Sequence, residues 1–190
     1  MSDALPLTGE HLALDLVNTR PAGGDLLAAP QDLHIWLGLQ AERFPEARDL
    51  AAAGPDAAGL AAVRAVREHT ARSLDRVRHG ERPPADALAA LNQAQRAAPA
   101  VAELGWNGEA VTLTRRRTGP PEARAAAWLA EAAAGLLADP SAARVRQCEA
   151  DDCVMLFLPA HPRRRWCSAA RCGNRVRVAR HYQRRKPPNG

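Results

Sequence analysis

The stretch from Cys148 to Lys186 reads CEADDCVMLFLPAHPRRRWCSAARCGNRVRVARHYQRRK, and the C-terminal part of the chain is organised around it. It holds all four cysteines of the protein, spaced as C-x4-C, thirteen further residues and a second C-x4-C. It also holds ten of the 26 lysine and arginine residues. Two close cysteine pairs within dense positive charge predict a small, basic, metal-stabilised module.

The four cysteines suit Zn²⁺, because this ion prefers tetrahedral sulfur and each close pair supplies two ligands through one short turn. We predict one Zn²⁺ per chain, with these ligands: Cys148, Cys153, Cys167 and Cys172. Four thiolates leave no position for water or substrate, so the zinc is expected to be structural and to stabilise a segment of about forty residues that is too short to bury a core of its own.

Two alternatives to four-cysteine zinc ligation remain open. Two disulfides would use the same four cysteines, and His161, between the pairs, could replace a thiol. The opening MSDALPLTGE has no charged and then apolar leader, so we expect a cytoplasmic protein. The reducing cytoplasm favours metal over disulfides.

The residues after Cys167 are predicted to form a helix that Ser168 caps and that Pro187 ends. At about 100° per residue, its basic side chains gather on one face and its apolar side chains on the other. We predict nucleic-acid contacts from this face, from the adjacent lysine and from the preceding arginine loop: Arg177, Arg180, His181, Arg184, Arg185, Lys186, Arg163, Arg164 and Arg165.

Arg175 falls on the cysteine-bearing side of this helix, away from the basic face. We expect its guanidinium to bind backbone carbonyls or zinc thiolates, or to dock the module on the body. Gly173 and Asn174 precede it and predict a tight turn around the fourth ligand.

Positive charge is concentrated at the C-terminal end of the chain. From Arg144 onward twelve arginine and lysine residues face three acids, a net charge of +9, whereas residues 1–143 carry fourteen against eighteen, a net charge of −4. Four thiolates and one Zn²⁺ would lower the C-terminal charge by about two. A basic module on an acidic body indicates a polyanionic partner that is bound by one end of the molecule.

The segments Trp166-Cys167-Ser168 and Cys172-Gly173-Asn174-Arg175, with the R-x-R-x-x-R-x-x-x-R-R run that starts at Arg175, resemble the CGNR zinc finger of bacterial proteins regarded as transcription regulators. The resemblance implies a treble-clef-like hairpin plus a basic helix, four cysteine ligands, structural roles near the metal for Trp166 and its neighbours, and DNA contacts from the basic residues. The loop FLPAHPRRR departs from the family pattern, so contacts of that loop are not carried over.

The N-terminal segment LTGEHLALDLVNTR resembles the opening of the ABATE domain, which often precedes such a finger. The matching positions are Leu12, Leu14, Asp15, Leu16, Asn18 and Thr19. Periodicity does not decide between helix and strand here. For Asn18 and Thr19 we favour hydrogen bonds to backbone at a turn over contact with a ligand.

The remaining pattern predicts an α+β, mostly α-helical chain. We expect helices at about 32–39, 56–79, 86–97 and 120–138, and a β-hairpin around Asn107-Gly108. In the helices, Leu39, Leu88 and Val77 are among the residues expected to face the core. Residues 1–143 are predicted to form an ABATE-like helical body and residues 144–190 the zinc finger, docked on it because no flexible linker separates them.

Two functions remain open for such a chain. The first is a transcription regulator whose body senses a small-molecule effector, works as a homodimer and binds duplex DNA through the basic helix. The second is an RNA- or protein-interaction module on an oligomerising body.

We expect no enzyme, because no catalytic motif is present, and no membrane span, because no apolar run approaches about eighteen residues.

Overall fold

The computed structural model describes residues 7–185, without the side chains at 180, 181 and 183–185. The helices of the described chain are α1 (Leu12–Val17), α2 (Pro30–Gln40), α3 (Pro45–Ala52), α4 (Ala57–Arg78), α5 (Ala85–Ala97), α6 (Pro121–Ala138) and α7 (Asn174–Arg185), with short turns of helix at Pro140–Arg144 and Ala169–Gly173. Strands β1 (Ala100–Trp106) and β2 (Val111–Arg117) form one antiparallel pair, and β3 (Arg146–Gln147) and β4 (Leu156–Phe157) form another. The predicted α+β, mostly helical class is confirmed.

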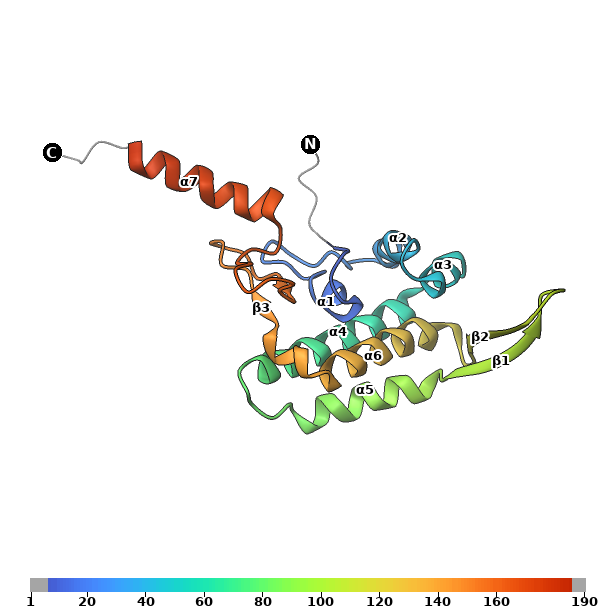
Figure 1. Cartoon of the computed structure of the whole chain (residues 1–190). Helices are drawn as coiled ribbons and strands as arrows, with labels where there is room; N and C mark the ends of the chain where they lie inside the picture. Colours follow the sequence, from blue (N-terminus) through green and yellow to red (C-terminus); the bar gives the residue numbers. More distant parts are fainter. Residues whose placement is uncertain (1–6, 186–190) are drawn as a thin grey trace.

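Helices α4, α5 and α6 pack side by side and form the centre of the body (Figure 1). The Asp56 side chain caps α4 by accepting a hydrogen bond from the Gly59 amide at 2.7 Å. The predicted stripe of α4 is buried at Leu60, Val63, Val66, Thr70 and Leu74. The four apolar residues of this stripe meet the buried face of α6 in the main hydrophobic core, which explains why a long amphipathic helix forms here.

The N-terminal segment folds as the short helix α1, which settles the choice between helix and strand. Five of its six residues are buried, because α1 lies against α4 and α6. Helix α3 was not predicted. It begins at Pro45, and one of its faces contacts the core through Ala47 and Leu50.

Asp32 lies in the first turn of α2, and its carboxylate accepts hydrogen bonds from the Ala28 and Ala29 amides. The core faces of three helices differ from the prediction. Leu39 and Leu88 are 51% and 37% exposed, so the core faces of α2 and α5 are narrower than expected. Val77, near the end of α4, is only partly buried.

The β1–β2 hairpin extends beyond the helices at one end of the molecule (Figure 1). Its turn follows the prediction: Asn107 Oδ1 accepts the amides of Glu109 and Ala110, and Gly108 has φ 98°, a conformation that glycine adopts at little cost. In the described part of the chain, no helix combines the length and the apolar character needed to cross a lipid bilayer.

The C-terminal module follows α6 at the opposite end from the hairpin (Figure 1). Its small core consists of Met155, Phe157 and three buried cysteines, and Val145 and Leu156 join the main core of the body. Helix α7 leaves this module and projects away from the body. Along α7, Val176 packs on the module core, whereas Val178 and Tyr182 are 53% and 70% exposed.

Candidate metal centre and basic surface

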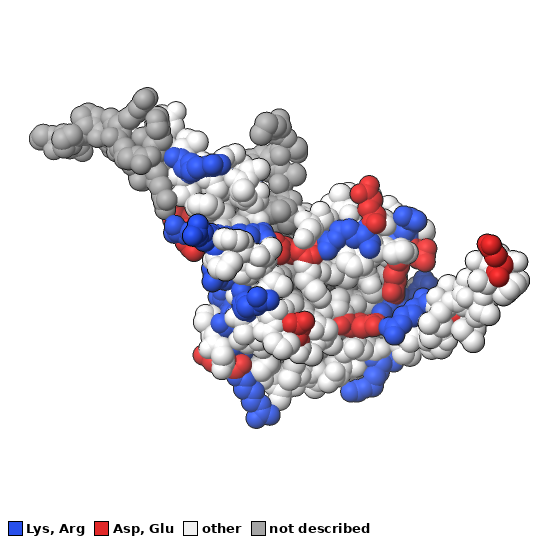
Figure 2. Space-filling model, in the orientation of Figure 1, with Lys and Arg blue, Asp and Glu red and all other residues white. Residues whose placement is uncertain are grey.

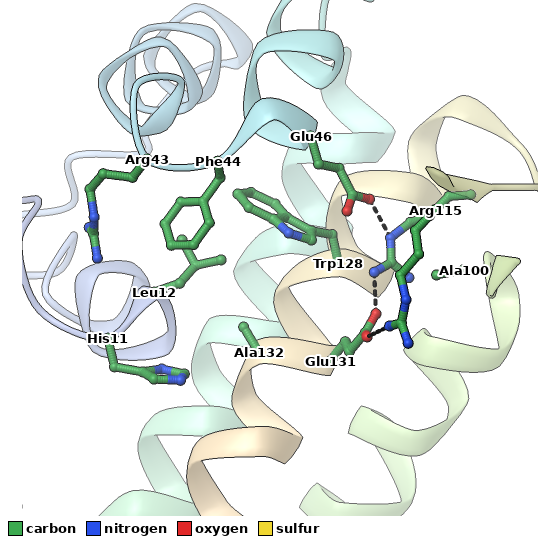
Figure 3. A pocket seen from close by; sticks show the side chains of 11 residues that line it. His11, Leu12, Arg43, Phe44, Glu46, Ala100, Arg115, Trp128, Glu131 and Ala132 are labelled. Carbon is green, nitrogen blue, oxygen red and sulfur yellow. Dashed lines mark hydrogen bonds and ion pairs between the residues drawn. The ribbon is translucent and has the colours of Figure 1, made fainter. Parts of the chain in front are cut away.

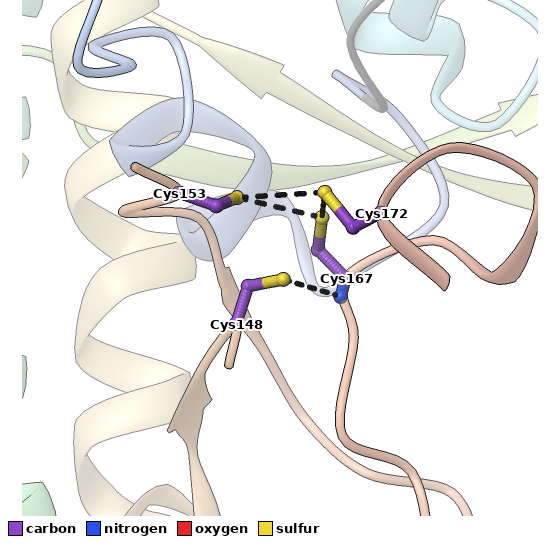
Figure 4. A group of neighbouring side chains, drawn as sticks. All are labelled: Cys148, Cys153, Cys167 and Cys172. Carbon is purple, nitrogen blue, oxygen red and sulfur yellow. Dashed lines mark hydrogen bonds between the residues drawn. The ribbon is translucent and has the colours of Figure 1, made fainter. Parts of the chain in front are cut away.

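The four cysteine sulfurs converge on one point from two separate parts of the module (Figure 4). All four lie within 4.8 Å of one another. Sγ of Cys167 is 3.6 Å from Sγ of Cys172 and 3.9 Å from Sγ of Cys153, and the last two sulfurs are 3.8 Å apart. Tetrahedral zinc with Zn–S bonds of about 2.3 Å requires sulfur separations of about 3.8 Å. The geometry therefore fits one structural zinc ion.

Short turns place each cysteine pair. Cys148 follows β3, its amide donates to the Met155 carbonyl at 2.9 Å, and the Cys153 amide donates to the Ala150 carbonyl at 3.1 Å. In the second pair, the Ser168 hydroxyl caps the turn by accepting the Arg171 amide at 3.3 Å. The Cys167 amide also donates to Sγ of Cys148 at 3.3 Å, which links the two pairs and orients one thiolate.

The arrangement of the sulfurs favours one metal ion over two disulfides, because all four gather at one point and none is bonded to another. All four cysteines are free, and three of them are buried. Burial raises the pKa of the Cys172 thiol to about 11 and raises that of Cys167 as well, since a buried thiolate loses its hydration. Zinc must displace these protons when it binds, so we expect its affinity to fall as the pH falls.

The residues expected near the metal lie around the second cysteine pair. The Gly173 amide donates to the Ser168 carbonyl at 3.0 Å in one wide π-helical turn. A Cβ at Gly173 would lie 3.4 Å from the Trp166 ring, so the backbone passes close to this side chain. Asn174 Nδ2 donates to the Ala170 carbonyl at 2.7 Å. This turn connects the fourth ligand to the start of α7.

Arg175 bonds to backbone in the first cysteine turn. Its guanidinium donates to the Asp151 carbonyl at 2.7 Å, which is one of the contacts expected for it. The bond spans 24 residues and connects the first turn of α7 to the loop between Cys148 and Cys153. Arg175 therefore joins the two halves of the metal centre.

Replacing Arg175 with alanine should accelerate zinc release by about fivefold, since it removes one charged hydrogen bond worth about 1 kcal/mol at an exposed position. Zinc transfer to a chromogenic chelator measures this rate. Arg163→Ala is the matched control, because Arg163 is an exposed arginine in the loop between the cysteine pairs. Equal release rates for the two variants would contradict the structural role of Arg175.

Asn18 and Thr19 form hydrogen bonds within the fold. Asn18 is buried and exchanges two hydrogen bonds of 2.8 Å with the backbone of Leu156, one through Nδ2 and one through Oδ1. Thr19 is buried too; its hydroxyl donates to the Leu16 carbonyl at 2.7 Å and accepts from Arg67 at 3.0 Å. These hydrogen bonds agree with the alternative that we favoured, except that the backbone bound by Asn18 belongs to strand β4 of the zinc module rather than to a local turn.

Asn18→Leu should lower the free energy of unfolding by about 2 to 6 kcal/mol, because it leaves one amide and one carbonyl of Leu156 buried without partners. Chemical denaturation followed by circular dichroism measures the change. Asn92→Leu supplies the control, since Asn92 is an exposed asparagine on α5. A loss for Asn18→Leu no larger than that of the control would argue against this contact as the joint between body and module.

Glu10 provides a second joint, which sequence reasoning missed. Its carboxylate accepts the Leu158 amide at 3.1 Å and pairs with Arg164 at 2.5 Å. These partners lie about 150 residues away along the chain, so no local pattern reveals the contact. Together Asn18 and Glu10 fix the module on the body, as the absence of a linker predicts.

The three loop arginines occupy different environments. Arg164 also donates to the carbonyls of Trp166 and Cys167 at 3.1 and 2.7 Å and lies over the Phe157 ring, 4.4 Å from its centre. These contacts engage the half-buried Arg164 within the module, whereas its predicted contact with nucleic acid stays a prediction. Arg165 pairs with Glu149 at 2.5 Å while 48% exposed, and Arg163 is exposed.

Only part of the basic face on α7 is described. Arg177 is exposed and its guanidinium bonds to Asn174 Oδ1. The helix backbone includes positions 180, 181, 184 and 185, but the side chains of Arg180, His181, Arg184 and Arg185 lie outside the described residues, as does Lys186 altogether. On the face drawn in Figure 2, acidic and basic groups alternate over the body.

The body contains a cavity of about 340 Å³ between α1, α6 and the base of the hairpin (Figure 3). Phe44 and Trp128 form its aromatic side, with ring centres 5.7 Å apart and edge to face. On its other side Arg117 pairs with Glu46 at 2.5 Å and with Glu131. The cavity is a candidate site for a small effector, but Asn18 and Thr19 do not line it.

A helical body with one hairpin, joined to a four-thiolate module and a basic helix, defines a zinc-finger protein with an appended helical domain. The family model for ABATE, described as a putative stress-induced transcription regulator, matches residues 10–140, and the CGNR zinc finger model matches residues 144–185. The chain therefore belongs to the ABATE family and carries a CGNR zinc finger. No curated protein matches it.

Proposed function

We propose that this chain is a cytoplasmic, non-enzymatic transcription regulator that binds duplex DNA through its zinc module. The observation that carries the proposal is the course of α7, which begins directly after the fourth zinc ligand and extends away from the body (Figure 1). A basic helix in this position is accessible to a groove or to a phosphate backbone. The net charge of +9 from Arg144 onward supports a polyanionic partner.

The structural zinc has a defined task in this proposal. It holds the first cysteine turn and the start of α7 together, and Arg175 reinforces the same connection. Asn18 and Glu10 then fix the module to the body. The direction of α7 is therefore set by the body, and a change in the body can alter how the helix meets DNA.

A small-molecule effector is the second part of the proposal, and the cavity of Figure 3 is its candidate site. Its volume lies at the lower end of the roughly 300 to 1,000 Å³ typical of ligand sites, and aromatic side chains form one of its sides. A screen of small metabolites tests this part, with duplex affinity as the readout. If every ligand that binds leaves this affinity unchanged, the cavity does not regulate the zinc module.

Competition between nucleic acids tests the main proposal. Zinc-loaded protein is titrated with labelled duplex DNA, duplex RNA and single-stranded DNA at physiological salt, and genomic fragments that it retains are then sequenced. We expect preference for duplex DNA and enrichment of a limited set of fragments. Preference for RNA would support the interaction-module alternative, and the absence of binding to all three would reject both nucleic-acid functions.

A further inference from the structure

The outer half of the β1–β2 hairpin presents an apolar face to solvent. In the antiparallel register Leu104 lies opposite Leu113, and Trp106 lies opposite Val111, so all four side chains stand on the same face. Their exposed fractions are 78% for Leu104, 66% for Trp106, 67% for Val111 and 66% for Leu113. We call these four residues the hairpin face. The opposite face is polar at Glu103, Thr112, Thr114 and Arg116.

The base of the hairpin is fixed to the body, although its outer half is not covered. Arg117 is 5% exposed, pairs with Glu46 and Glu131, and donates to the Ala98 carbonyl at 3.1 Å. An isolated two-stranded hairpin is marginally stable in water, and both of its strands here are edge strands. The hairpin is thus anchored at one end and presents uncovered apolar side chains at the other (Figure 1).

We propose that the hairpin face is a homodimer interface, which packs against the same face of a second copy of this chain. A two-fold axis places a patch against itself, so a charged patch would repel its own copy, whereas this face consists of four uncharged apolar residues. The projecting hairpin is mostly uncharged on the side shown in Figure 2. Arg115 follows on the same face but pairs with Glu131, so the face lacks the excess of basic residues that attracts an anionic membrane surface.

The exposed area is of the size that such a contact needs. The aromatic range of about 150 to 250 Å² is an upper bound for these side chains, so four that are each about two-thirds exposed present at most roughly 400 to 650 Å² per copy. Complete burial of two such faces would remove about 800 to 1,300 Å² from solvent, a range that includes the roughly 1,000 Å² expected of a specific interface. Trp106 supplies an aromatic anchor of the kind that is enriched among the residues contributing most to binding at interfaces.

A dimer through the hairpin face would form without DNA, and it would also affect how the zinc modules meet a duplex. The hairpin and α7 leave the body at opposite ends (Figure 1). A dimer formed through the hairpin faces therefore leaves both zinc modules away from the contact. Each copy would bring its own basic helix to a duplex.

Sedimentation equilibrium of the full, zinc-loaded chain tests the proposal over a concentration series. We expect wild-type protein to approach twice its monomer mass of 20.4 kDa. Leu113→Glu would bury one carboxylate from each copy in the apolar contact and should weaken association by at least about 100-fold. Thr112→Glu is the matched control, because it adds the same charge one residue away on the opposite face and should still dimerise.

Circular dichroism and zinc content must match wild type for both variants, which is expected because neither position lies in the core. Wild-type protein that stays monomeric at all concentrations would overturn the proposal, and so would a Leu113→Glu protein that dimerises like wild type. Duplex binding by the Leu113→Glu variant separates the dimer proposal from the DNA-binding proposal. A variant that is monomeric and still binds duplex would show that the hairpin face serves dimerisation and is not needed for DNA binding.

Discussion

Cys167→Ser is expected to abolish zinc binding and to unfold the segment from Cys148 to the end of α7, while the helical body stays folded. Cys167 is 9% exposed and its sulfur lies 3.6 and 3.9 Å from two other ligands, so a serine there removes a corner of the tetrahedron. Zinc supplies about 10 to 16 kcal/mol to small structural modules. The module core offers little to replace this free energy.

Metal analysis and hydrogen exchange by mass spectrometry measure the two parts of this result. Ser168→Ala provides the control, since it changes the adjacent residue, removes only a helix cap worth about 1 kcal/mol and should retain zinc. Amides of α4 and α6 should remain protected in both variants. If Cys167→Ser retained one zinc per chain and normal protection of the module, the four-thiolate site would be refuted.

The combined replacement Arg180→Ala and Arg184→Ala should reduce the dependence of duplex binding on salt. Each phosphate contact contributes about −0.9 to the slope of log affinity against log salt, so the loss of two contacts flattens the slope by about two units. The zinc content should not change, because neither residue is a ligand. The positions of these side chains on the basic face follow from the helical repeat of the sequence.

Arg72→Ala with Arg76→Ala is the matched control for the pair on α7. These arginines have the same four-residue spacing on α4, are exposed, and pair with Asp86 and Glu81. Their removal should leave the slope unchanged. An equal effect of both pairs would indicate that charge anywhere on the molecule binds DNA, and no effect of the α7 pair would remove the basic face from the interface.

The metal centre was predictable from sequence because its ligands form two local pairs and the chemistry of four thiolates is restrictive. The hairpin turn and the main helices were predictable for a similar reason, since Asn107-Gly108 and the stripe of α4 are local patterns. The joint between body and module was not. Asn18 bonds to Leu156 across 138 residues of sequence, and Glu10 pairs with Arg164 across 154. The sequence position of a polar residue does not reveal which distant group it will hydrogen-bond.

Arg164 illustrates the same limit for charge. In sequence it stands between two arginines and is indistinguishable from them, yet the fold turns it onto Phe157 and Glu10 while Arg163 remains exposed. The hairpin face was missed in another way. Alternation predicts that one face of the hairpin is apolar, but only the tertiary structure shows that no part of the described body covers it.

The central claim is that the zinc module binds duplex DNA through its basic helix, and a salt series with wild-type protein tests it most directly. Affinity for labelled duplex is measured from low to physiological salt, with zinc-loaded protein and with protein stripped by a chelator. If about four to six basic side chains engage phosphate, the slope should be about −4 to −5, and the stripped protein should lose this binding. Zinc-loaded protein without measurable duplex binding near physiological salt would contradict the account.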